Sequence, residues 1–339
     1  MRDAISNTEL QVSVVIPTRN RRGLLQRALA STLGQEDVVV EAIVVDEASE
    51  DDTAAYLAGL GDSRLSVVRH DPPRGVAGAR NAGLARARAP WVAFLDDDDA
   101  WAPDKLATQL EGLEANPASR WSCVAAVDVD EELRLLEPQL APESGGSDVV
   151  PLLLEVNVIP GGGSGVLADT ALVRAVGGFD EELAILADWD LWIRLGLQSP
   201  LTAIHRPLVA YLRHEGGMTT GMPGIRAELD RVDTKYAEER RARRVELAWE
   251  FWLPYIALMQ RRAGLRLAPA AQYMRLTLRT RNPTVLLRAA GALVRPQGIG
   301  PLRRRGRRPI PPGWREEAEG WLTPIREQAY RGEQPVAGR

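Results

Sequence analysis

The sequence has a single cysteine and no long apolar run. Cys123 cannot form a disulfide within the chain, and it lies inside the apolar run 121–127, where a buried thiol packs like a small hydrophobic side chain. No histidine is spaced to activate it. The first residues lack the apolar core of a signal peptide, and no stretch of ~18 uninterrupted apolar residues occurs. These absences predict a reducing, cytoplasmic location without a membrane-spanning helix.

Acidic residues and lysine are missing from one long segment. Residues 259–308 contain thirteen Arg, no Lys, no Asp and no Glu, so this segment carries +13 although the net charge of the chain is −4. Two interpretations stay open: a solvated Arg-rich surface, or a surface for anionic lipid headgroups or a lipid-phosphate acceptor, which would give peripheral membrane contact. No nucleic-acid motif accompanies the arginines, so nucleic acid is not a predicted partner.

The rest of the composition is that of a folded globular protein. The chain has 339 residues, of which 45% are hydrophobic and 26% charged. This length allows two domains, or one large domain with an appendage.

Four short apolar runs alternate with helical stretches in the first hundred residues. Their starts lie about 25 residues apart, which is too far for hairpins and suits strand, helix, strand crossovers. We therefore expect a largely parallel sheet. The runs are Val12–Ile16, Val38–Val45, Leu65–Arg69 and Trp91–Leu95.

The pattern changes after Asp104. A helix is predicted over 105–115, a further strand over 121–127, an acidic surface excursion over 128–148 and an amphipathic helix over 188–197. Helical periodicity with Pro breaks dominates from about Met222 onward.

We therefore predict an α/β fold with a mostly parallel central sheet flanked by helices, followed by a helical C-terminal region. The boundary is placed near Gly224, which gives a catalytic domain over 1–224 and an Arg-rich helical region over 225–339. The second region would shape the acceptor site, form a homodimer, or lie on a membrane surface. Its aromatic stripe, which includes Trp249 and Trp252, favours simple core packing.

Polar residues gather where the predicted parallel strands end. In such sheets ligands bind outside the carboxyl ends of the strands. The first strand runs into Pro17, Thr18, Arg19 and Asn20, the second into Asp46, and the fourth into four consecutive aspartates, 96–99.

The aspartate run predicts a cation site. Carboxylates packed this closely repel one another and any anion unless a cation neutralises them. Mg²⁺ takes one or two carboxylates together with substrate phosphates, and Mn²⁺ favours the same ligands. The sequence thus predicts a metal-bridged diphosphate. The alternative is a solvated acidic turn in which Asp99 or Asp104 caps the next helix.

The sequence gives weaker evidence for binding roles of Asp46 and Arg80. A carboxylate at the position of Asp46 could accept hydrogen bonds from a nucleobase or ribose, or it could cap the helix that begins near Asp51. Arg80 lies in the glycine-spaced loop 74–83, where its planar guanidinium suits phosphate or base recognition.

Six blocks of sequence together resemble family 2 glycosyltransferases of the bacterial type with the GT-A fold. They occur in the order and approximate spacing of that family between about Val12 and Thr220. The blocks are VSVVIPTRN, IVVDEAS with the following DDT, GVAGARNAGLARA, FLDDDDAWAPDKL, VGGFDEEL and ADWDLWIRLG.

The resemblance implies a role for each matching position. Asp98 would be the likeliest direct metal ligand within a DXD-like motif, although the run leaves the register ambiguous. His214 resembles a C-terminal histidine that contacts the metal or diphosphate, with an exposed loop histidine as the alternative. The implied nucleotide-sugar residues are Pro17, Thr18, Asn20, Asp46, Arg80, Asp96 and Asp97, and the implied metal ligands are Asp98, Asp96 and His214.

The resemblance further implies that Asp188 is the general base. Asp188 and Asp190 point in different directions on a helix, so only one of them reaches the site, and the family pattern selects Asp188. A structural alternative is that Asp188 only caps its helix. The chain departs from the family in having Ala187 before this residue and DEAS, with Glu47 and Ala48, where DDGS is commoner.

The predicted function is an inverting, metal-dependent transfer of a sugar from a nucleoside diphosphate, by preference UDP, to a hydroxyl acceptor that is a carbohydrate, lipid-linked or another alcohol. Mn²⁺ or Mg²⁺ would be the cofactor. Two alternatives remain: a nucleotidyltransferase that makes the activated sugar, or a non-catalytic module that binds a sugar nucleotide or a partner.

Overall fold

The computed structural model describes residues 9–143, 148–214, 224–262, 264–294 and 309–332. The chain divides into two compact units. Unit 1 comprises 1–150, 158–213 and 309–339, and unit 2 comprises 151–157 and 214–308.

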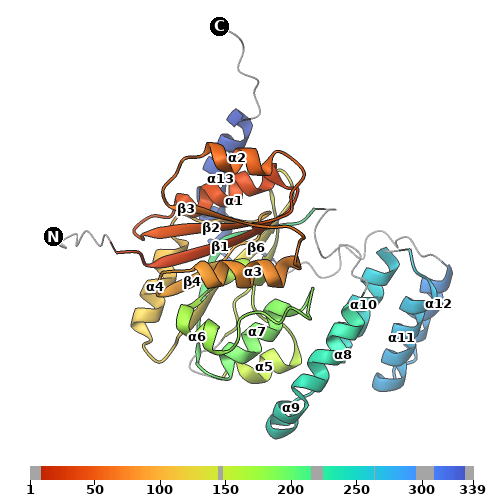
Figure 1. Cartoon of the computed structure of the whole chain (residues 1–339). Helices are drawn as coiled ribbons and strands as arrows, with labels where there is room; N and C mark the ends of the chain where they lie inside the picture. Colours follow the sequence, from red (N-terminus) through yellow and green to blue (C-terminus); the bar gives the residue numbers. More distant parts are fainter. Residues whose placement is uncertain (1–8, 144–147, 215–223, 263, 295–308, 333–339) are drawn as a thin grey trace. The chain divides into compact units, whose positions relative to one another are not determined.

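Unit 1 is built on one nine-stranded sheet (Figure 1). Its strand order is β3-β2-β1-β4-β8-β6-β9-β5, with β7 paired to β6. The strands are β1 (Val12–Thr18), β2 (Val40–Glu47), β3 (Leu65–His70), β4 (Trp91–Phe94), β5 (Ala100–Trp101), β6 (Trp121–Val129), β7 (Leu135–Gln139), β8 (Val166–Asp169) and β9 (Leu201–Leu212).

The first four strands confirm the predicted parallel sheet. β1 pairs in parallel with both β2 and β4, and β2 pairs in parallel with β3. All residues of β1 and β2 are buried, as expected for central strands of a parallel sheet that is covered on both faces. Antiparallel strands enter only after β4, where β8 pairs with β4 and β6.

Helices cover both faces of this sheet. The helices of unit 1 are α1 (Arg22–Leu33), α2 (Thr53–Gly59), α3 (Gly75–Arg86), α4 (Lys105–Ala115), α6 (Thr170–Ala175), α7 (Ala187–Gly196) and α13 (Trp314–Gly332). Side chains of α1, α2, α4 and α13 share one core with the even-numbered apolar residues of β1. α3 packs on the other face, where a Cβ on Gly83 would lie 2.2 Å from Val15 Cγ1.

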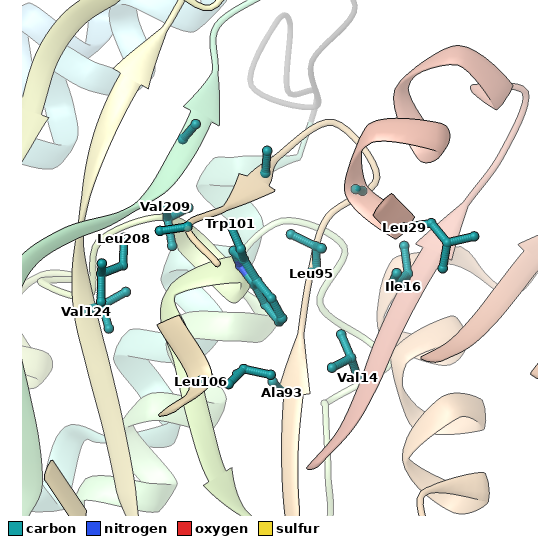
Figure 2. Packing of buried hydrophobic residues seen from close by; sticks show 14 of the residues in the cluster. Val14, Ile16, Leu29, Ala93, Leu95, Trp101, Leu106, Val124, Leu208 and Val209 are labelled. Atoms are coloured by element: carbon teal, nitrogen blue, oxygen red, sulfur yellow. The ribbon is translucent and has the colours of Figure 1, made fainter. Parts of the chain in front are cut away.

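The core on the first face centres on Trp101. Figure 2 shows its indole among side chains from β1, β4, β6, β9, α1 and α4, together with Leu95, which directly follows β4. On the opposite face Trp192 of α7 stacks on Trp121 of β6, with ring centroids 6.1 Å apart. The first core holds α1 and α4, and the tryptophan stack holds α7 against β6.

Two features differ from the sequence predictions. The excursion predicted over 128–148 contains β7, which forms an antiparallel edge strand against β6. The units also do not follow the boundary predicted at Gly224, because unit 1 ends its second segment at Arg213 and regains α13 from the C-terminal region. The predicted helix 105–115 coincides with α4, and that over 188–197 with α7 to within one residue.

Unit 2 is helical. It contains most of α5 (Val150–Glu155) together with α8 (Ile225–Lys235), α9 (Ala237–Arg243), α10 (Trp249–Arg262), α11 (Leu267–Thr280) and α12 (Thr284–Val294). α10, α11 and α12 share a small core that includes Leu253, Tyr273 and Val285. Within the part of the chain that is described, no helix combines the length and apolarity needed to cross a membrane.

Candidate functional site

The ends of three parallel strands bring the predicted polar residues to one edge of the sheet. Thr18 at the end of β1 pairs in register with Asp46 at the end of β2. β1 also pairs with β4, and Asp96 follows two residues after the end of β4. The structure therefore assembles the polar positions of three loops at this edge, as the strand pattern predicted.

Asp97 is held from the β1 side of the edge. The Thr18 hydroxyl donates to Asp97 Oδ2 at 2.8 Å, and Arg21 Nη1 lies 3.0 Å from both Asp97 Oδ1 and Asp98 Oδ2. Burial, followed by the charge of Asp98, raises the pKa of Asp97 to about 6, although Arg21 and Thr18 oppose this shift. Both Asp97 oxygens are thus engaged by protein groups, and Arg21 neutralises part of the aspartate run.

Asp99 points away from the others and into the protein. Its carboxylate accepts the Ser164 hydroxyl at 2.6 Å and the Leu212 backbone N–H at 3.1 Å, and the residue is 2% exposed. Burial, with the charges of Asp98 and Asp96, raises its pKa well above the ordinary value. Asp99 therefore joins the aspartate run to the glycine-rich turn and to β9.

The glycine-rich turn lies directly against the run. It consists of a 3-10 turn over Gly162–Gly165. The Asp96 backbone N–H donates to Ser164 Oγ at 3.1 Å, and the Trp101 indole N–H donates to the Ser164 carbonyl at 2.8 Å. This turn is fixed from two sides, and its backbone forms part of the site.

Arg80 pairs with Asp96 beside this turn. The Arg80 guanidinium is 3% exposed, hydrogen-bonds to Asp96 Oδ1 and lies 5.2 Å from the centroid of the Phe179 ring. Its Nε has no hydrogen-bond partner among the described residues. A Cβ on Gly163 would come within 2.9 Å of Arg80 Nη2, so a larger residue here would displace the guanidinium.

Asp188 lies at the start of α7 on the other side of the turn. A Cβ on Gly162 would lie 3.6 Å from Asp188 Oδ2 and 3.9 Å from the Tyr211 ring. Asp188 Oδ1 accepts the Trp189 N–H at 2.6 Å. Burial raises the pKa of Asp188, while the Arg80 charge lowers it and Asp96 raises it further. Asp188, Arg80 and Asp96 thus form one electrostatic group.

Asp190 takes a different direction, as the helical spacing predicted. It is fully buried and forms a two-pronged ion pair with Arg194, at 2.7 and 2.9 Å. Arg194 also donates to the Val176 carbonyl at 2.6 Å. This pair anchors α7 within the fold. The N-cap position of α7 is Leu186, and Asp188 lies in the first turn, where it accepts the Trp189 N–H; its role as the base stays a proposal.

The loop after β2 is tied to the loop after β1. Asp46 is 1% exposed, accepts the Ser49 N–H at 2.9 Å and pairs with Arg69. Asn20, with φ of 54°, donates its N–H to Ser49 Oγ at 2.9 Å, and its Oδ1 accepts the Glu50 N–H at 2.7 Å. Pro17 lies buried in β1. Asp46 does not cap α2, whose N-cap is Asp52.

Glu47 has a role that the sequence analysis missed. The residue is 5% exposed, and its Oε2 accepts the backbone N–H groups of Arg74 and Gly75, each at 2.6 Å. Its Oε1 pairs with His70 Nδ1. Negative charge is favourable at a helix N-terminus, where N–H groups lack partners. The departure from DDGS therefore ties β2 to the start of α3, the helix that carries Arg80.

Other contributors were also unassigned in the sequence. Arg21 directly follows the polar residues at the end of the first strand, and Ser164 lies in the glycine-rich segment Gly161–Gly165, to which the sequence analysis gave no role. His214 directly follows unit 1 and is the first residue of the long segment of unit 2. Its role stays a prediction, and residues 215–223 lie outside the described part.

The residues at the edge fit a divalent cation in their donor chemistry. Asp96 and Asp98 present carboxylate oxygens, and their side chains are 20% and 16% exposed. One or two carboxylates with substrate phosphates are a common set for Mg²⁺. Among the described residues, no group of three or more His, Cys, Asp or Glu side chains is arranged to hold a metal by itself. Substrate phosphates and water are the further ligands that Mg²⁺ usually takes.

Comparison with known proteins bears on the same part of the chain. Residues 13–141 match Glycosyl transferase family 2. The chain is similar to the succinoglycan biosynthesis protein ExoO of Rhizobium meliloti (42% identity over 104 residues, 31% of this chain and 30% of ExoO). It is also similar to the UDP-Glc:alpha-D-GlcNAc-diphosphoundecaprenol beta-1,3-glucosyltransferase WfaP of Escherichia coli (34% over 103 residues, 30% of this chain and 41% of WfaP). The chain thus aligns with less than half the length of either relative.

The fold extends the similarity along the chain. The crystal structure of S. aureus TarS 1-349 in complex with UDP-GlcNAc matches 96% of this chain and 93% of its own length, with a TM-score of 0.59 and 18% sequence identity. At this identity the likeness concerns the fold, and it confirms the GT-A-like architecture predicted from the sequence.

Proposed function

We propose, from the match of residues 13–141 to glycosyl transferase family 2, that the chain transfers a sugar from a nucleoside diphosphate to a hydroxyl acceptor with inversion at the anomeric carbon. UDP is the proposed nucleotide, because WfaP is named for UDP-Glc and TarS was crystallised with UDP-GlcNAc. The name of WfaP also makes a lipid-linked acceptor the first class to assay.

The observation that carries the proposal is the grouping of Asp188 with Arg80 and Asp96 around the glycine-rich turn. Burial raises the pKa of Asp188, and a carboxylate with a raised pKa is a better proton acceptor than an ordinary surface aspartate. The neighbouring arginines, Arg80 and Arg21, offer positive charge for a diphosphate on the same edge.

In the proposed reaction the acceptor oxygen attacks C1 of the sugar, and the bond from C1 to the diphosphate oxygen breaks. Asp188 takes the proton of the acceptor hydroxyl, and the nucleoside diphosphate leaves with the bonding electron pair. A single displacement of this kind inverts C1. A divalent cation, Mn²⁺ or Mg²⁺, would stabilise the charge on the leaving diphosphate, and Asp96 and Asp98 are the residues proposed to hold it.

Three variants compared in one assay of UDP binding and UDP release test the proposal. Asp188→Asn is expected to keep UDP-sugar affinity and the melting temperature while turnover falls by about 10²- to 10⁴-fold, the usual contribution of a general base. Asp190→Asn is the matched control, because its carboxylate is buried against Arg194. This control should lower the melting temperature and keep turnover per folded molecule.

Asp98→Ala is expected to remove the increase in UDP affinity that Mn²⁺ gives, measured by calorimetry. Asp104→Ala serves as its control, because Asp104 lies close in sequence but pairs with Arg206 at 2.8 Å. Undiminished turnover of Asp188→Asn would exclude this base. Release of pyrophosphate in place of UDP would instead identify a nucleotidyltransferase, and binding without turnover of the unaltered chain would identify a non-catalytic module.

A further inference from the structure

Unit 2 exposes far more large apolar side chains than unit 1. Of the thirteen such side chains exposed in the described part of the chain, ten belong to unit 2. The three most exposed are Leu267 at 79%, Leu287 at 76% and Leu278 at 74%, all on α11 or α12. Concentration of apolar side chains on a surface marks a contact site more often than chance exposure does.

On α11 these side chains form a stripe at helical spacing. Leu267, Ala271, Met274 and Leu278 recur every three or four residues and are all exposed. The opposite face of the helix is already used, because Tyr273 and Leu276 are buried in the core of unit 2. α11 therefore has two apolar faces, of which only one has a partner within the described unit.

α12 repeats this arrangement. Val285, Ala289 and Ala292 are buried, whereas Leu286, Leu287 and Leu293 are between 41% and 76% exposed. Its sequence, TVLLRAAGALV, contains a single charged residue, Arg288. A helix that is apolar on all sides normally lies in an apolar environment. α11 and α12 have 14 and 11 residues, which is too short to span a bilayer.

The positive charge of α11 and α12 indicates which kind of partner would bind their exposed apolar side chains. Arg275, Arg279 and Arg288 are exposed on these two helices, with Arg279 also paired to Glu246. Neither helix contains an acidic residue. A second copy meeting this surface symmetrically would bring the same cationic segment against itself. A nucleic acid would match the arginines and leave the leucines in water. Anionic lipid headgroups above acyl chains match both.

We propose that the exposed stripes of α11 and α12 bind the surface of a membrane that contains anionic lipid, with the leucines in the interface and the arginines at the headgroups. The proposal does not depend on the transfer reaction, because it concerns lipid binding alone.

Co-sedimentation of the full-length protein with vesicles tests it. We expect binding to phosphatidylcholine vesicles that contain phosphatidylglycerol, little binding to pure phosphatidylcholine, and a loss of binding as salt screens the headgroups. The double variant Leu278→Glu/Leu287→Glu should bind at least about tenfold more weakly, because two apolar side chains leave the interface. Val67→Glu is the matched control, since Val67 is 46% exposed on β3 of unit 1.

A melting temperature and a UDP affinity equal to those of the unaltered protein would establish that the double variant is folded. Equal binding of both vesicle types, unaltered binding by the double variant, or a loss of binding in Val67→Glu would each overturn the proposal. So would a concentration-dependent dimer, seen by analytical ultracentrifugation, that the double variant dissociates while vesicle binding is absent. The proposed function would stand in each of these cases.

Discussion

Lys105 is a lysine whose side chain is buried among apolar residues. It is fully buried at the start of α4, and its Nζ donates to Gln109 Oε1 at 2.7 Å and lies 3.8 Å from the centroid of the Trp101 ring. Gln109 in turn donates to Ser122 Oγ at 3.2 Å and to the Gly165 carbonyl at 3.2 Å. Burial lowers the pKa of Lys105 well below 10.5. Through Gln109 the amine therefore supports the glycine-rich turn, and burial disfavours its charged form.

The depressed pKa of Lys105 gives a signed dependence of stability on pH. Between its pKa in the folded state and 10.5, the unfolded chain holds a proton on this residue that the folded chain lacks. The free energy of unfolding consequently rises with pH, by about 1.4 kcal/mol per pH unit from this residue. Lys105→Met should lack this slope. Urea unfolding at a series of pH values below about 10.5 measures it, with the difference between the two proteins growing wherever the pH exceeds the pKa of Lys105 in the folded state.

The only other lysine supplies the control for this measurement. Lys235 is exposed on α8, so Lys235→Met should follow the unaltered protein at every pH. Parallel pH profiles for the unaltered protein and Lys105→Met would contradict a lowered pKa of Lys105 in the folded state.

At the scale of elements, Glu47 decides how α3 is fixed to the sheet. Removing its carboxylate in Glu47→Ala would leave two N–H groups at the start of α3 and the buried His70 without their acceptor. We expect a loss of about 1–3 kcal/mol in the free energy of unfolding. Backbone amides of the first turn of α3 should also exchange faster with solvent, measured by hydrogen exchange and mass spectrometry.

Glu47→Gln should recover most of this stability, because the amide oxygen still accepts N–H groups and the size is unchanged. Glu50→Ala, at an exposed position of the same loop, should lie within about 0.5 kcal/mol of the unaltered protein. A similar loss in Glu50→Ala would mean that any change in this loop loosens α3.

Local periodicity explains which elements could be predicted. The four parallel strands and the helix 105–115 form from contiguous apolar patterns, and all five were found. β7 and β9 were not predicted because each contains a proline, Pro138 and Pro207, which counts against a strand. In the structure β7 is an edge strand, and irregular register in the β6–β9 pairing adjoins Pro207. Whether a segment that contains proline forms a strand therefore depends on strands that lie far away in the sequence.

The contacts of the candidate site likewise include some that the sequence could predict and some that it could not. Thr18, Asp46 and Asp96 could be grouped because parallel strands end at one edge. The contact between Ser164 and Asp99 could not be predicted, because Ser164 lies on a turn from a distant part of the chain. The position of that turn depends on its hydrogen bond with the Trp101 indole. The metal and base assignments come from the family resemblance and stay proposals.

On the scale of the whole molecule, the chain leaves unit 1 after Arg213 and returns to it at Pro309. The returning helix, α13, is integrated into the fold of unit 1. The Trp321 indole N–H donates to the Pro207 carbonyl at 3.2 Å, and Arg326 Nη2 donates to the Leu133 carbonyl at 2.7 Å. Leu322 is fully buried in the same core as α1 and α4. The segment matched by the family, 13–141, therefore folds against a C-terminal helix from outside that segment.

This arrangement predicts that a substitution in α13 destabilises unit 1. Leu322→Ala removes buried atoms from the shared core and should lower the free energy of unfolding of unit 1 by about 2–5 kcal/mol. Leu287→Ala, at a 76% exposed position of α12, should change it by less than about 0.5 kcal/mol. Urea unfolding followed by hydrogen exchange of β1 and β4 peptides separates the two units. Undisturbed exchange in Leu322→Ala would mean that α13 contributes nothing to the sheet, whereas faster exchange at the ends of β1 and β4 would link the C-terminal helix to the stability of the site.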